Sequence, residues 1–152
     1  VCVEAGAAFY ADANGTPVNA GQVYTGGGAV CGTLTVGTNG VIACGPTEAL
    51  TVENLVFQPG GVCCVFCETD GTCQPIEIGN LTLPKGTVVV DIDRPNEKVR
   101  PSGVLMRCAG DFTDNGVEWL IRGGHSATRV VIDSANREIR LSTPTGTLIR
   151  LL

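Results

Sequence analysis

The sequence predicts an all-β protein: an antiparallel β-sandwich or barrel-like domain, with a smaller disulfide-stapled β unit on its N-terminal side. Three observations lead to this prediction. Charged residues make up only 16% of the chain and 21 of its 152 residues are glycine, a composition typical of a β protein with many turns. Short β-branched runs alternate with turn signals at the spacing of a sandwich or barrel. Finally, the 8 cysteines are concentrated toward the N-terminus.

The segment from Gly60 to Cys73 organises the prediction, because it holds half of the cysteines. Asp70-Gly71 between two apolar runs is a hairpin signal, since glycine takes a positive φ without steric cost. A three-residue loop ending at Gly71 places Cys67 opposite Cys73. Opposed strand positions hold their Cβ atoms about 4.5–5.5 Å apart, close enough to consider a disulfide.

All eight cysteines are disulfide candidates, although only the pairing of Cys67 with Cys73 has a geometric argument. Cys63 and Cys64 are adjacent, so in a strand they point to opposite faces and require different partners. The Cys64–Cys67 spacing also occurs in zinc and redox sites. The other cysteines are scattered and the chain has one histidine, so we expect no metal site and no cofactor. The candidates are Cys2, Cys31, Cys44, Cys63, Cys64, Cys67, Cys73 and Cys108.

Charge divides the chain into two segments near Lys85. Residues 1–84 contain no lysine or arginine and carry a net charge of −7, whereas residues 85–152 carry +2, which together give the net −5. We therefore predict a cysteine-rich acidic β unit over 1–84 and a β-sandwich-like domain over 85–152, with one continuous domain as the alternative. The asymmetry also suggests that the acidic half of one copy meets the basic half of the next, head to tail.

The elements follow in order along the chain. Short strand-like segments at 1–4 and 22–25 come first. A hairpin is expected where Thr33–Val36 and Val41–Cys44 flank Asn39-Gly40, because Asn-Gly is the strongest short hairpin signal. Extended segments at 50–52 and 55–57 and the cysteine hairpin follow. After Lys85 a meander of strands is expected at 87–92, 103–108, 117–121, 128–132 and 137–141, with a last hairpin through Pro144-Thr145-Gly146 into 148–151.

No catalytic constellation is visible in the sequence. Asp91 and Asp93 share one strand face, but such a pair more often ends a strand in solvent than binds Ca²⁺ or transfers protons. His125, the only histidine, follows two glycines in a turn and has no serine and orienting acid placed beside it. We therefore predict that the protein is not an enzyme.

The composition also limits partners and compartment. A net charge of −5 argues against nucleic acid as a partner, and no apolar run reaches the ~18–20 residues that span a bilayer. Val1-Cys2-Val3-Glu4 does not resemble a signal peptide, which suggests a mature or trimmed chain. Eight cysteines favour an oxidising setting, so a virion or extracellular location is expected. Asn14 and Asn80 begin glycosylation sequons.

Residues 87–132 resemble one known class of protein. A strand ending in Asp91, a glycine-started strand at Gly103, Trp119-Leu120 and a glycine-rich turn at 123–126 follow one another in this order. This order is similar to that of β-sandwich domains in siphophage distal-tail and minor-tail proteins, although Arg122-Gly123-Gly124-His125 stands where a Pro-Gly-Asn-like turn is expected. The resemblance implies a virion component that docks in a ring or tube and has no catalytic residues.

The sequence therefore predicts a structural, self-assembling subunit of a virion (tail or coat) or of an extracellular filament. Its partners would be copies of itself and other assembly subunits, in a homo-oligomer. The alternative is a secreted binding module that recognises carbohydrate or protein through loops between strands.

Overall fold

The strands alternate between two sheets, so that each coil of the chain adds a strand to both. The computed structural model describes residues 1–145, and within these the secondary structure consists of strands without any helix. Sheet A has the order β1 (Cys2–Val3), β4 (Val23–Gly26), β6 (Val41–Cys44), β8 (Val62–Phe66), β10 (Gly86–Asp93), β13 (Val117–Arg122). Sheet B has the order β14 (Arg129–Asp133), β15 (Glu138–Ser142), β11 (Gly103–Cys108), β9 (Ile76–Leu83), β7 (Thr51–Phe57), β5 (Ala29–Val36), β2 (Ala8–Tyr10), while β12 (Phe112–Asp114) pairs with β9 and β3 (Thr16–Val18) with β5.

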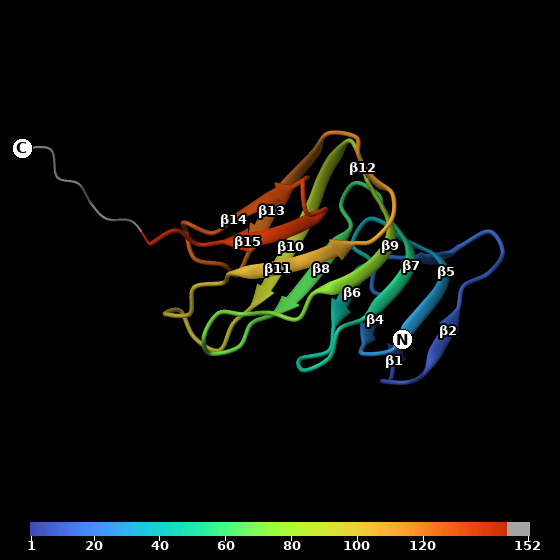
Figure 1. The fold of residues 1–152 in the computed structure, drawn as a ribbon, viewed down its shortest axis with the longest axis horizontal. Coiled ribbons are helices and arrows are strands. Elements are labelled where there is room, and N and C mark those ends of the chain that lie inside the picture. The colour runs from blue at the N-terminus through green and yellow to red at the C-terminus, as the bar shows by residue number, and fades with distance from the viewer. Residues whose placement is uncertain (146–152) are drawn as a thin grey trace, which may run out of the picture.

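Every pair of neighbouring strands in sheet A is parallel, and so are the pairs of sheet B from β2 and β3 through to β11 and β12. A chain that returns to the same sheet one coil later, in the same direction, is a two-sheeted parallel β-helix, in which each coil contacts mainly its neighbours. Figure 1 shows the coils advancing along the long axis, from the blue N-terminal strands at right to the red C-terminal strands at left.

The core consists of side chains that repeat from coil to coil between the two sheets. In sheet B the backbone register places Leu34 beside Leu55 and Leu55 beside Leu81, and all three are at most 1% exposed. In sheet A, Ile42 lies beside Cys63, which in turn lies beside Val90. Since parallel strands lie about 4.8 Å apart, each inward side chain packs against its equivalents in the coils before and after.

Asparagine side chains of β7 and β9 join successive coils within sheet B. Asn80 Nδ2 donates to Asn54 Oδ1 at 2.8 Å, and Asn54 Nδ2 donates to the carbonyl of Gly32 at 3.5 Å. On the other side, the backbone N–H of Asp111 donates to Asn80 Oδ1 at 2.8 Å. This ladder links successive coils, and it occupies the amide nitrogen of the Asn80 sequon.

The predicted antiparallel sandwich or barrel is wrong, since sheet A is wholly parallel and sheet B is mixed. The expected hairpin around Asn39-Gly40 shows why. The turn forms, with Asn39 at a φ of 59°, but it carries the chain from β5 in sheet B to β6 in sheet A, so the two strands do not pair. Turn residues reverse the chain equally well at a hairpin and at a β-helix corner, and the local sequence does not distinguish the two.

Other predictions hold. The all-β composition is confirmed for the described residues, and the strands around 128–132 and 137–141 form the expected antiparallel hairpin, β14–β15. β15 also pairs antiparallel with β11, so sheet B ends in an antiparallel unit. The predicted last hairpin through Pro144-Thr145-Gly146 extends into residues 146–152, which lie outside the described part of the chain.

The charge boundary near Lys85 coincides with no break in strand pairing. β8 pairs with β10 in sheet A, and β9 pairs with β11 in sheet B, so both ladders cross from the acidic segment into the basic one. The division into two units, 1–84 and 85–152, stays a prediction, as does the alternative of one continuous domain. No helix among the described residues is long and apolar enough to span a membrane.

Candidate interaction surfaces

The cysteines are mostly part of the packed interior. All eight lie within the described residues and are free thiols, so the prediction of a disulfide-stapled N-terminal unit is wrong. Buried thiols fill core positions as small apolar groups: Cys44 Sγ donates to the carbonyl of Pro75 at 3.1 Å, and Cys108 Sγ to that of Asp111 at 3.2 Å. Burial raises the pKa of Cys44 to about 11, which keeps this thiol protonated and unreactive at neutral pH.

The hairpin at the centre of the sequence has the predicted register. Cys67 and Cys73 form an antiparallel bridge, Gly71 has a φ of 89°, and the N–H of Glu68 donates to the carbonyl of Thr72 at 2.8 Å. The pairing of the two positions is therefore confirmed, while the disulfide that we expected between them is not formed.

Cys63 and Cys64 do point to opposite faces. Cys63 is fully buried, whereas Cys64 is half-buried and lies beside Asp91 of β10 in the register of sheet A. Among residues 1–145, no group of three or more histidine, cysteine or acidic side chains is arranged to hold a metal ion.

Asp91 and Asp93 occupy alternate positions of β10, as predicted, on either side of the buried Ile92. Asp91 lies beside Arg122 of β13 in the register of sheet A, and Asp93 is exposed. His125 lies in the turn between β13 and β14, where its Nδ1 accepts a hydrogen bond from the N–H of Ala127 at 3.1 Å. This contact shapes the turn.

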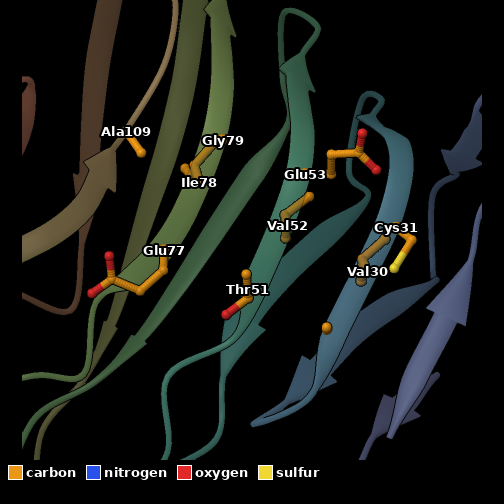
Figure 2. Close-up of a pocket in the computed structure, with 10 residues that line it drawn as sticks. Val30, Cys31, Thr51, Val52, Glu53, Glu77, Ile78, Gly79 and Ala109 are labelled. Atoms are coloured by element: carbon orange, nitrogen blue, oxygen red, sulfur yellow. The ribbon is translucent and has the colours of Figure 1, made fainter.

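A shallow, mostly apolar hollow of about 420 Å³ crosses the outer face of β5, β7 and β9 (Figure 2). Figure 2 shows Glu77 on one side of Thr51 and Glu53 on the other. Both carboxylates have partners: Glu53 Oε2 accepts from the N–H of Gly32 at 2.6 Å, and Glu77 pairs with Arg107 at 2.6 Å. Because Glu53 and Glu77 each already have a partner, they are not arranged as an acid–base pair. Small residues leave room for the hollow, namely Ala29, Cys31, Gly79 and Ala109.

The N-terminal end of sheet B presents an open strand edge. β2 pairs only with β5 among the described strands, through bonds from Ala29 N–H to Ala7 at 3.0 Å and from Ala11 N–H to Cys31 at 2.8 Å. Because hydrogen bonds alternate in direction along a parallel strand, the N–H groups of Ala8 and Tyr10 point away from β5. The Tyr10 side chain is 76% exposed.

The adjoining strand β3 is protected in a way that β2 is not. Val18 accepts a hydrogen bond from the N–H of Gly37 at 3.0 Å, so the outward-facing position of β3 is that of Pro17. Proline has no N–H to offer and is a common means of blocking an edge strand. At the N-terminal end of sheet B, the outward backbone N–H groups that remain without a partner among the described residues therefore lie on β2.

At the C-terminal end, the last described strand is β14 in sheet B and β13 in sheet A. The charged strand β15 is not an edge strand, since it lies between β14 and β11. There Glu138 pairs with Arg107 at 3.1 Å and with Arg140 at 2.6 Å. In sheet A the last strand is β13, and its inward side chains, including Trp119, are only partly buried.

The sequence contains a short repeat that marks successive coils of the β-helix. Turn and hairpin signals do not reveal this repeat. Thr51, Val52, Asn54 and Leu55 lie beside Glu77, Ile78, Asn80 and Leu81, so the motif apolar-x-Asn-Leu recurs at a constant offset. Such self-similarity indicates a repeat architecture. The offset changes in other coils as the corner loops lengthen, which hides the repeat elsewhere in the chain.

No protein-family model matches the chain, and no curated protein matches it.

Proposed function

We propose that this chain is a non-catalytic structural subunit that assembles with copies of itself, in a virion or an extracellular filament. The observation that carries the proposal is the open edge of β2, whose outward N–H groups have no partner among the described residues. Edge strands recruit further strands through their backbone. The matching surface is the outer edge of β14, the last strand of sheet B, which exposes 46% of Val131.

The charge distribution supports head-to-tail contact over contact between like ends. The coils without lysine or arginine lie at the end that carries β2, and the basic residues lie toward the end that carries β14. Opposite charge at the two ends favours stacking of one end on the other and disfavours pairing of two acidic ends. The resemblance of residues 87–132 to phage tail proteins is the reason to name a virion as one destination.

The test is sedimentation velocity as a function of protein and salt concentration, with Ala8→Pro and Ala8→Val compared with the parent chain. Proline removes an outward N–H that no described contact uses, whereas valine keeps it. We expect the parent and Ala8→Val to form assemblies that dissociate as salt rises, and Ala8→Pro to remain monomeric. A parent chain that is monomeric under all conditions, or an Ala8→Pro variant that assembles normally, would refute the proposal.

The hollow on sheet B favours a second candidate function, a binding module for carbohydrate or protein. Thr51 lines the hollow at an exposed position of β7, so Thr51→Trp fills it without disturbing the core. Binding to a glycan array that is lost in Thr51→Trp and kept in Ala8→Pro would support this function, and absence of binding by the parent chain would exclude glycans.

A further inference from the structure

Two rows of outward side chains cross the hollow on sheet B. Outward positions alternate with buried positions along each strand, and the strand register aligns them from coil to coil. The first row consists of Ala8, Ala29, Thr51, Glu77 and Arg107. The second row begins with Tyr10 beside Cys31 and continues over Glu53 to Gly79, one position before the Asn54–Asn80 pair. Aromatic and polar groups from β2, β7, β9 and β11 therefore share one side of sheet B.

A bulge in β5 holds one of the two carboxylates in place. The register of β5 shifts between Val30 and Thr33, and Gly32 within this bulge has a φ of 91°. The N–H of Gly32 donates to Glu53 Oε2 at 2.6 Å. Bulges commonly re-aim a side chain next to a functional site, and this one fixes Glu53 at the border of the hollow.

Each carboxylate beside the hollow keeps one oxygen available. Glu53 uses Oε2 for Gly32, and Glu77 uses Oε1 for Arg107, while the described residues supply no hydrogen bond to Glu53 Oε1 or Glu77 Oε2. Hydrogen bonds to an ionised acceptor are about twice as strong as those between neutral groups. Thr51, which lies between the two acids (Figure 2), adds a hydroxyl that donates or accepts. The hollow thus offers three hydrogen-bonding groups around a mostly apolar floor.

Tyr10 supplies an aromatic surface at the end of the second row. Its side chain is 76% exposed, whereas the preceding Phe9 packs inward, edge-on against Tyr24, with ring centroids 5.4 Å apart. The core packing of the described residues therefore does not use the Tyr10 ring. An exposed ring beside an apolar hollow with a few polar groups suits a ligand that has apolar C–H faces and a polar rim. Pyranose rings have this character.

The charges around the hollow select the class of sugar. Residues 1–84 contain no lysine or arginine, and Arg107, the cation of the first row, is paired with Glu77 at 2.6 Å and with Glu138 at 3.1 Å. A sugar acid or a sulfated glycan would meet two carboxylates, and like charges brought together disfavour binding. The hydroxyl groups of a neutral sugar are donors that both carboxylates can accept.

We propose that the hollow on sheet B binds a neutral oligosaccharide, with one pyranose ring packed on Tyr10 and hydroxyl groups of the chain donating to Glu53 and Glu77. A single sugar fits less well, because Tyr10 lies one strand beyond the border of the hollow at Cys31. Tyr10 and Glu53 are two strand spacings apart, about 10 Å, a distance that a disaccharide bridges. This inference rests on the second candidate function and names its ligand and the groups that recognise it.

The test is binding of the fluorescently labelled protein, in a concentration series, to an array of neutral and acidic oligosaccharides. The parent chain is compared with Tyr10→Ala, with Glu53→Gln, and with the control Phe66→Ala, which removes a ring that is 37% exposed on sheet A. We expect the parent and Phe66→Ala to bind neutral glycans equally and acidic glycans not at all. Tyr10→Ala and Glu53→Gln should each weaken binding about tenfold. Circular dichroism verifies folding, and if one of these two variants does not fold, the other decides.

Three outcomes would overturn the proposal. The first is a preference for acidic glycans. The second is equal binding of neutral glycans by the parent, Tyr10→Ala and Glu53→Gln; if Thr51→Trp still abolishes that binding, the second candidate function holds and only the contacts assigned here are wrong. The third is binding of hexalysine, measured by calorimetry, without binding of any glycan, which would assign the carboxylates to a basic peptide. None of these results bears on assembly through β2.

Discussion

Replacing Leu55 by alanine tests the coil-to-coil packing of the β-helix. Leu55 is fully buried between Leu34 of the coil before and Leu81 of the coil after. Deleting a buried leucine side chain costs about 2–5 kcal/mol, with the larger values where the cavity cannot collapse. The backbone ladders on both sides of β7 hold the neighbouring leucines in place, so we expect the free energy of unfolding to fall by about 3–4 kcal/mol.

The matched control is the next residue along the strand. Val56 is half-buried and lies on the opposite face of β7, so Val56→Ala should cost about 1 kcal/mol or less. The assay is urea unfolding under reducing conditions, monitored by circular dichroism. The free energies are compared for variants whose m-values equal that of the parent chain. A loss below about 1 kcal/mol for Leu55→Ala, or an equal loss for the two variants, would refute the packing argument.

Three further predictions follow from the structure. Burial raises the pKa of Cys44 to about 11 and that of Cys73 to about 12. Thiols of the unfolded chain ionise near pH 8.5–9, so the contribution of these thiols to the free energy of unfolding should be full below that pH. It should decline as the pH rises toward 11–12, which thermal unfolding at stepped pH would measure. Asn80→Ala removes the acceptor of the Asp111 N–H and one link of the asparagine ladder, and should cost about 1–2 kcal/mol in urea unfolding; an unchanged midpoint would show that the ladder contributes nothing. Gly123→Ala places a Cβ on a residue with a φ of 71°, against a backbone carbonyl of the neighbouring coil, and should cost about 1–3 kcal/mol; a melting temperature equal to that of the parent would contradict this conformation.

The cysteine hairpin illustrates what was predictable about the candidate sites. The three-residue loop and the pairing of Cys67 with Cys73 depend on a turn closed within a few residues, so the local sequence is sufficient. The disulfide was not predictable in the same way, because buried cysteines also serve as ordinary apolar side chains. Cys63 does so here, in a column between Ile42 and Val90.

The open edges could not be located from the sequence. Ala8 and Tyr10 are unremarkable residues of a short apolar segment, and their N–H groups become available only because β2 is the outermost strand at one end of sheet B. Pro17 carries a local signal, since proline suits an edge, but the sequence does not indicate which edge. Among the described strands, β13 is the last of sheet A for an equally global reason, the unequal number of strands in the two sheets.

By itself the sequence determined the strands, the turns between them and the separation of charge along the chain, because composition, alternation and turn residues act over a few neighbouring positions. Only the tertiary structure decided which strands pair. A turn such as Thr38-Asn39-Gly40 reverses the chain both in an antiparallel hairpin and at the corner of a β-helix. The choice depends on contacts between coils some twenty residues apart, where Leu34, Leu55 and Leu81 bury one another.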